Sequence, residues 1–216
     1  KSSWGIYDGP FLQSVAQELN KSSNPFVAFI LTVSNHPPYT LPNDFQVAQD
    51  DWSPREKTAY YADQSLKQFF ASIKSFKWFE DTLFVITADH PPFPYDKKDS
   101  LNRTFYAHRR IPIVVYHPGK ALGPARRSLK ITSQLDILPS IIDFLGLDED
   151  LKFLTTPFGR SFFNENNIGL ALFEEGESLV MMCGNERSSL SFDGKISKSI
   201  TLDKTFKLSK NDRCFS

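Results

Sequence analysis

An acid and an imidazole directly follow a strand-like run in the middle of the chain. The run Thr82-Leu-Phe-Val-Ile-Thr87 is mostly apolar or β-branched, and it leads through Ala88 into Asp89-His90. A carboxylate and an imidazole together suit Zn²⁺ or Mn²⁺ better than Ca²⁺. Both can reach one cation only if the backbone turns sharply, and the end of a strand permits such a turn. The alternative is a chance pair in which Asp89 serves only to form the turn.

A second apolar run that ends abruptly in polar residues lies earlier in the chain. The apolar run Pro25-Phe-Val-Ala-Phe-Ile-Leu-Thr-Val33 ends in Ser34-Asn-His36, followed by two prolines. An apolar run without alternation indicates a strand buried on both faces, as in a parallel sheet. Ligands of open α/β sheets gather beyond the carboxyl ends of the strands. We therefore expect His36, Asp89 and His90 to face one crevice, whereas the alternative for His36 is a hydrogen bond within its own loop.

Helices and further strands must position these side chains. Asp8-Gly9-Pro10 predicts a helix start with Asp8 as its cap, and Ser53-Pro54 predicts a second start. Residues 111–116 read as a third strand, and a third helix is expected between Ser133 and Gly146. This alternation predicts an α/β fold with a mostly parallel sheet, flanking helices and right-handed crossovers.

The pattern changes from about Ile168 onward. Short alternating runs appear there, and Asp193-Gly194 is typical of a tight hairpin turn. We expect residues 1–165 to form the α/β part and residues 166–216 to form an antiparallel β appendage of the same domain. No Pro/Gly/Ser-rich linker separates the two parts of the sequence.

Composition excludes some classes of function. Lys and Arg together number 25, as do Asp and Glu, so the formal net charge is zero. This balance argues against a nucleic-acid binder that relies on bulk positive charge. The sequence also contains no apolar run of about 18 residues, the length that a transmembrane helix requires.

Six segments carry a family resemblance through their order and spacing. They are Trp4-Gly-Ile-Tyr-Asp8, Phe29-Ile-Leu-Thr-Val-Ser-Asn-His-Pro-Pro-Tyr39, Tyr61-Ala-Asp63, Ala88-Asp-His90, Ile111-Pro-Ile-Val-Val-Tyr-His-Pro-Gly119 and Gln134-Leu-Asp-Ile-Leu-Pro-Ser-Ile-Ile-Asp-Phe-Leu-Gly146. Together they resemble the second half of the sulfatase and alkaline-phosphatase-like superfamily. The most similar branch is that of the lipoteichoic acid synthases, which are bacterial phosphoglycerol transferases.

The resemblance implies roles for three residues. Asp89 and His90 become ligands of a catalytic divalent metal, with Mn²⁺ expected first and Zn²⁺, Mg²⁺ and Ca²⁺ as alternatives, and His36 becomes a contact of the substrate phosphate. Pro91-Pro92 departs from the family pattern, because many relatives have Gly after the His, so the family's local loop geometry is not carried over to this position. The family's nucleophile and a further acidic metal ligand are expected upstream of Lys1, so we assign no catalytic nucleophile in this chain.

The resemblance also implies a function and a location. We expect a metal-dependent phosphotransferase or sulfatase-family hydrolase that acts on phosphate or sulfate esters of envelope lipids or glycans. Its partners are that substrate and the N-terminal half of the same protein, and no nucleic acid. We expect it to be periplasmic or on the cell surface, anchored in the membrane through segments outside this chain.

Several alternatives stay open from the sequence. They are a true sulfatase, a phosphoethanolamine transferase, a binding or regulatory module without turnover, and a structural α/β domain with chance motifs. An extracytoplasmic location would allow Cys183 and Cys214, the two cysteines, to form a disulfide. The alternative is two unpaired thiols.

Overall fold

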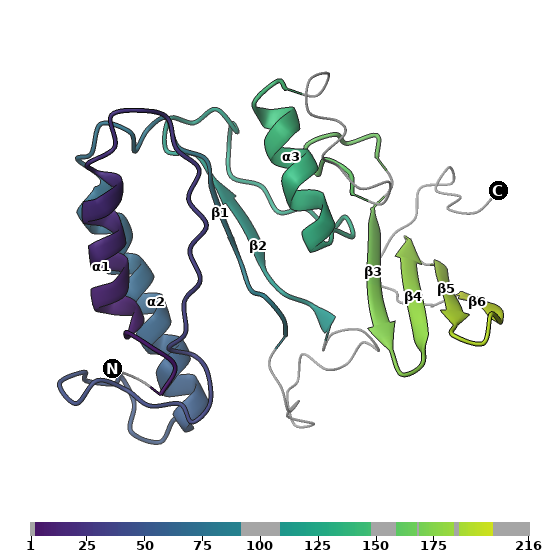
Figure 1. Cartoon of the computed structure of the whole chain (residues 1–216), viewed down its shortest axis with the longest axis horizontal. Helices are drawn as coiled ribbons and strands as arrows, with labels where there is room; N and C mark the ends of the chain where they lie inside the picture. Colours follow the sequence, from purple (N-terminus) through teal and green to yellow (C-terminus); the bar gives the residue numbers. More distant parts are fainter. Residues whose placement is uncertain (1–2, 92–108, 148–158, 168, 184–185, 201–216) are drawn as a thin grey trace. The chain divides into compact units, whose positions relative to one another are not determined.

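The computed structural model describes residues 3–91, 109–147, 159–167, 169–183 and 186–200. The chain divides into two compact units. The first unit comprises Lys1–Leu83 and His117–Ala121, and the second comprises Phe84–Tyr116 and Leu122–Ser216. Figure 1 shows the helices and strands of both units.

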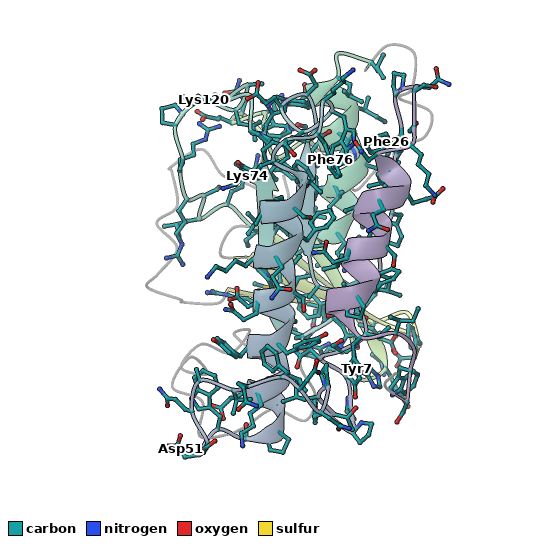
Figure 2. The ribbon with its side chains drawn as sticks, turned by 90° about the vertical axis from the view of Figure 1, so that its left-hand side faces the viewer. Tyr7, Phe26, Asp51, Lys74, Phe76 and Lys120 are labelled. Atoms are coloured by element: carbon teal, nitrogen blue, oxygen red, sulfur yellow. The ribbon has the colours of Figure 1, made fainter. Side chains whose placement is uncertain are left out.

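Two helices packed side by side form the first unit. They are α1 (Asp8–Leu19) and α2 (Pro54–Ile73). Both run in the same direction, because Tyr7 and Asp51 lie at one end of the pair and Phe26 and Lys74 lie at the other (Figure 2). The buried apolar side chains of this unit are Leu12, Ala16, Tyr61, Phe69, Ile73 and Phe79.

The start of α2 agrees with the prediction. The Ser53 backbone N–H donates to Glu56 Oε2 over 2.8 Å, and the Glu56 backbone N–H donates to Ser53 Oγ over 3.3 Å. This reciprocal capping box satisfies two backbone donors that a helix end leaves unpaired. Pro54 occupies the first helical turn, where its missing N–H costs nothing.

The predicted capping role of Asp8 is wrong. The N-cap of α1 is Tyr7, whose own side chain makes no capping hydrogen bond. Asp8 is instead buried, with 2% of its surface exposed, and its Oδ1 accepts from the backbone N–H groups of Val33 and Ser34, both over 3.0 Å. The Ser34 hydroxyl in turn accepts from the Asp8 backbone N–H over 2.8 Å. A tertiary contact therefore replaces the local cap.

The strand predicted over residues 25–33 is also not formed. The segment is not assigned to any strand, and it pairs with no strand among the residues described. Its side chains are largely exposed, with 99% of Val27 and 95% of Phe29 accessible to solvent. Only its ends are held, because Phe26 packs edge-on against Trp78 and the Val33 N–H reaches Asp8. A strand needs neighbours to accept its backbone hydrogen bonds, and the described chain places none there.

The second unit contains the two other predicted strands. Strands β1 (Phe84–Thr87) and β2 (Ile113–Tyr116) pair in register from Phe84 opposite Tyr116 to Thr87 opposite Ile113, and lie side by side (Figure 1). Their pairing is antiparallel, so the predicted parallel arrangement is wrong for this pair. A parallel pair needs a crossover, usually a helix. The sequence between β1 and β2 carries loop composition instead, which permits an antiparallel return.

A short 3₁₀ turn, η3 (Gln134–Asp136), leads into α3 (Ile137–Phe144), which confirms the third predicted helix. Gly146 follows at φ 68°, a left-handed conformation that suits glycine and ends the helix. The buried Asp136 carboxylate accepts from the backbone N–H groups of Ser133 and Arg160, both over 2.8 Å. Burial raises the pKa of Asp136, while these two donors act in the opposite direction. The carboxylate thus ties the residues near Arg160 to the start of α3.

Four antiparallel strands complete the described part of the second unit. They are β3 (Leu170–Glu175), β4 (Ser178–Cys183), β5 (Glu186–Ser191) and β6 (Ile196–Ile200), in the sheet order β3-β4-β5-β6. The predicted hairpin is present, because the Ser191 N–H donates to Lys195 O over 2.9 Å and Gly194 has φ 86°. The predicted antiparallel region is therefore confirmed over these strands.

The predicted disulfide is only partly visible. Cys183 is disulfide-bonded, as that prediction requires, whereas Cys214 lies outside the described residues. Within the described ranges, no helix is both long and apolar enough to cross a lipid bilayer.

Candidate metal and phosphate sites

The turn after β1 brings the side chains of Asp89 and His90 together. The backbone bends at Asp89 and His90, and Asp89 Oδ1 accepts from the backbone N–H of His90 over 2.9 Å. The other carboxylate oxygen, Oδ2, lies 3.5 Å from His90 Nε2. Both side chains are about two-thirds exposed, at 66% and 64%, so a ligand can approach them.

The protonation of His90 suits a metal ligand. Its Nδ1 lies 2.8 Å from the carbonyl oxygen of Pro91. A carbonyl can only accept a hydrogen bond, so Nδ1 carries the proton and the lone pair of neutral imidazole lies on Nε2. Metal-binding histidines are commonly oriented in this way by a backbone carbonyl. The acceptor here is the backbone carbonyl of the residue that follows His90.

The spacing of the two candidate ligand atoms fits a divalent cation. A tetrahedral cation with bonds of about 2.1 Å holds neighbouring ligand atoms about 3.4 Å apart. The separation of 3.5 Å between Asp89 Oδ2 and His90 Nε2 is close to this spacing. When His90 is protonated, the same two groups form an ion pair, so a proton and a cation compete for Nε2. In the described parts of the chain, no third His, Cys, Asp or Glu joins them in a cluster.

Gln134 holds the backbone of this turn from η3. Its side-chain amide Nε2 donates to the carbonyl oxygens of Ala88 and Asp89, both over 2.9 Å. The two bonds fix consecutive peptide groups at the position where Asp89 must present its carboxylate. Sequence reasoning gave Gln134 no role, although it opens the segment that carries the resemblance near α3. Its position just before the third predicted helix was the only feature of the sequence that could have suggested a role for Gln134.

His36 occupies an exposed turn of the first unit. The Tyr39 N–H donates to His36 O over 2.9 Å, and Tyr39 adopts φ 57°, a left-handed conformation that is unusual for a residue with a side chain. The His36 Nδ1 lies 2.9 Å from the Pro37 carbonyl oxygen, and its ring packs against Trp4. The hydrogen bond within its own loop, which was the alternative stated for His36, is therefore present and engages Nδ1.

Buried polar groups anchor the His36 turn to both helices of its unit. The Thr58 hydroxyl, fully buried on α2, donates to Asn35 Oδ1 over 2.9 Å. Asp8 on α1 holds the Val33 and Ser34 backbone, as described above. Asn35 is thus fixed to α2, and Ser34 is fixed to α1. These contacts fix the backbone that carries His36.

The structure tests only part of the expected convergence. Asp89 and His90 lie together, as predicted from their order after a strand. His36 belongs to the first unit and these two residues to the second. The expectation that all three face one crevice therefore stays a prediction.

Comparisons with known proteins agree with the resemblance. The family described as Sulfatase matches residues 1–147. The chain is 23% identical over 188 residues to lipoteichoic acid synthase 1 of Bacillus subtilis, an alignment that covers 80% of this chain and 28% of that protein.

Two solved structures show a similar fold. One is a protein in the alkaline phosphatase superfamily from Vibrio parahaemolyticus, with a TM-score of 0.69, 22% identity and coverage of 91% of this chain and 47% of that one. The other is a lipoteichoic acid synthase from Listeria monocytogenes, with a TM-score of 0.60, 18% identity and coverage of 89% and 54%. The fold is alkaline-phosphatase-like, and the chain spans about half the length of these structures.

Proposed function

Because the chain belongs to the sulfatase family, we propose that it is the metal- and phosphate-contacting part of a metal-dependent phosphotransferase or hydrolase. Its substrates are phosphate or sulfate esters of envelope lipids or glycans. The observation that carries this proposal is the 3.5 Å separation of Asp89 Oδ2 and His90 Nε2, with the His90 proton held on Nδ1. The lipoteichoic acid synthases among its relatives favour phosphoryl transfer over sulfate hydrolysis.

Asp89 and His90 would hold the divalent cation in this proposal. Mn²⁺ is the first candidate, and Zn²⁺, Mg²⁺ and Ca²⁺ are the alternatives. When bound, such a cation stabilises negative charge on a phosphoryl group. The contribution of the chain itself is orientation, because Gln134 and Pro91 fix the carboxylate and the imidazole before the cation arrives.

His36 would contact the phosphate oxygens through Nε2. Its Nδ1 is engaged with Pro37 O, so Nε2 can donate only when the imidazole carries both protons. A donor of that kind forms a charge-assisted hydrogen bond, which is shorter and stronger than a neutral one. Support for this role comes from its exposure in a turn that both helices anchor.

We also propose that another segment of a longer protein covers residues 26–31 and supplies the nucleophile and the remaining metal ligands. The support is the exposure of Val27, Phe29 and Leu31 at 99%, 95% and 61%, since contiguous exposed apolar side chains mark interaction surfaces. The chain also spans only 28% of the Bacillus subtilis synthase.

An extracytoplasmic location belongs to the same proposal. The disulfide at Cys183 supports it, because disulfides persist in oxidising compartments outside the cytosol. The membrane anchor would lie in segments outside this chain.

Turnover by the protein that contains this chain and the sequence before it tests the proposal. Aryl phosphate, aryl sulfate and a glycerophospholipid are each supplied with Mn²⁺, Zn²⁺, Mg²⁺ or Ca²⁺ in turn, and release of each product is measured. Asp89→Asn and His90→Gln should each lower kcat/KM by more than about a hundredfold, since even residues that only orient metal ligands commonly cost 10–100-fold. Asp81→Asn, at an exposed carboxylate before β1, is the matched control.

The outcome also separates the candidate functions. Product from the aryl sulfate alone would replace phosphotransfer with sulfatase activity. Wild-type turnover in Asp89→Asn would refute the metal site, and the absence of turnover with every substrate and metal would favour a binding module.

A further inference from the structure

Trp4 contacts the candidate phosphate ligand, yet neither the sequence patterns nor the proposed chemistry gives it a role. Its indole ring lies against the His36 imidazole, with ring centroids 4.0 Å apart and an interplanar angle of 53°. Its Nε1–H donates to the carbonyl oxygen of Pro37 over 2.7 Å. From these contacts we infer that Trp4 is a positioning residue that makes Nε2 the phosphate-facing nitrogen of His36. This inference rests on the proposed phosphate-binding function of His36.

Two donors converge on one acceptor in this arrangement. The Pro37 carbonyl oxygen receives the Trp4 Nε1–H over 2.7 Å and the His36 Nδ1–H over 2.9 Å. A carbonyl oxygen has two lone pairs and can accept both bonds. The Trp4 bond therefore holds the carbonyl at the place where it meets Nδ1, without competing for the His36 proton.

The contacts of His36 with Pro37 and Trp4 disfavour other ring orientations and the other tautomer, which an exposed imidazole would otherwise adopt. Turning the His36 ring over would place a carbon atom against the Pro37 oxygen and lose the Nδ1 hydrogen bond. Moving the proton to Nε2 would set the Nδ1 lone pair against the carbonyl lone pairs. The Trp4 ring covers part of one face of the imidazole and limits its tilt. Nδ1 is thus committed to the turn, and Nε2 remains for the ligand.

A purely structural role makes a different prediction. If the Trp4 N–H served only to satisfy the Pro37 carbonyl, its loss would leave the His36 proton and any bound phosphate unaffected. If Trp4 positions His36, the loss changes both. Trp4→Phe separates these cases, because phenylalanine keeps an aromatic ring beside His36 and removes the N–H donor.

Nitrogen NMR of the histidine rings reads the effect directly. The chain is labelled with ¹⁵N-histidine, and the four histidines are few enough to resolve. His36→Gln identifies the His36 signals by their disappearance. At a pH where the ring is neutral, we expect a protonated Nδ1 and a bare Nε2 in the native chain, and a shift toward a mixture of the two tautomers in Trp4→Phe. Trp52→Phe is the control, since Trp52 packs on Tyr60 in the same unit.

Titration with inorganic phosphate supplies the functional readout. At a pH where His36 is protonated, Trp4→Phe should weaken phosphate binding about fivefold, the effect of one lost hydrogen bond. His36→Gln should weaken it more, and Trp52→Phe should leave it unchanged. Unshifted His90 and His117 signals would establish that Trp4→Phe is folded.

The outcomes for Trp4 and for the proposed function are distinct. Native tautomer and native affinity in Trp4→Phe, with binding lost in His36→Gln, would overturn the role of Trp4 and leave that of His36 standing. Unchanged phosphate affinity in His36→Gln would instead refute the phosphate-binding role, and the inference with it, whatever the tautomer.

Discussion

The His36 turn and the Asp89-His90 turn contain the same local hydrogen bond, but different contacts anchor the two turns to the rest of the fold. In both, a histidine precedes a proline and Nδ1 meets the carbonyl oxygen of that proline, over 2.9 Å for His36 and 2.8 Å for His90. The His36 turn is attached to two helices through the buried side chains of Asp8 and Thr58. The Asp89-His90 turn depends on the exposed amide of Gln134 and on bonds between neighbouring residues.

This difference in anchoring shows which of the two turns is held in place by the buried core of its own unit. Buried contacts of the fold hold the turn that carries His36, the proposed phosphate contact. The Asp89-His90 turn has fewer supports, and in the proposed site it would supply two of the three or more protein ligands that a catalytic metal commonly has, with no third candidate clustered there in the described residues. The first turn should therefore respond to changes in the core, and the second to changes at the surface and to metal.

The largest expected effect concerns the chain by itself. It should show no turnover of an aryl phosphate or sulfate, and it should bind Mn²⁺ and Zn²⁺ weakly or not at all. Two ligands on a turn leave most of the coordination shell to water, and in the proposed division of the site the nucleophile that would form a covalent intermediate lies in another segment. Calorimetry and product release measure both quantities. Micromolar affinity that Asp89→Ala abolishes, or steady turnover, would contradict the proposed division of the site.

Removing the anchor of the His36 turn should have the next largest effect. Asp8→Ala leaves the N–H groups of Val33 and Ser34 without their acceptor and should lower the free energy of unfolding by about 3 kcal/mol. Urea titration measures the change, with the exposed Asp63→Ala as the control. The His36 ring signals should shift while those of His90 stay in place. Equal shifts at both histidines would show that the two turns do not differ in their support.

Loss of the Gln134 amide should affect the metal turn only. Gln134→Met keeps the length of the side chain and removes the two donors to Ala88 and Asp89. In the longer protein, Mn²⁺ affinity should fall about tenfold, as for other residues that orient metal ligands. Saturating Mn²⁺ should restore much of kcat. Gln64→Met, on the surface of α2, should change neither quantity, and native affinity in Gln134→Met would remove Gln134 from the site.

The smallest expected effect concerns Asp136, which lies in the same 3₁₀ turn as Gln134. Burial raises the pKa of Asp136 above its ordinary value of about 3.8, so the folded chain holds this proton to higher pH than the unfolded chain. The contribution of Asp136 to stability is therefore greatest below 3.8 and is lost as pH rises through the raised pKa. Carboxyl ¹³C NMR across this range measures the pKa. A value at or below 3.8 would show that the hydrogen bonds from Ser133 and Arg160 outweigh burial.

The sequence by itself determined the features that depend on neighbouring residues. The capping box at Ser53, the glycine stop at Gly146 and the hairpin at Asp193-Gly194 were all predictable, because their hydrogen bonds and backbone angles are local. The sharp turn that brings Asp89 to His90 is local for the same reason. The six ordered segments also identified the family that the comparison confirms.

Only the tertiary structure decided the features that join distant parts of the chain. Asp8 lost its expected capping role because Val33 and Ser34 offered it two buried donors. The run at residues 25–33 has the composition of a buried strand. Whether it forms one depends on neighbouring strands to pair with, which the sequence of the run itself does not specify. Trp4 and Gln134 gained their contacts with the His36 and Asp89 turns in the same way. Hydrogen bonds between residues far apart in the sequence depend on which segments pack together. The local sequence pattern around each residue does not specify that packing.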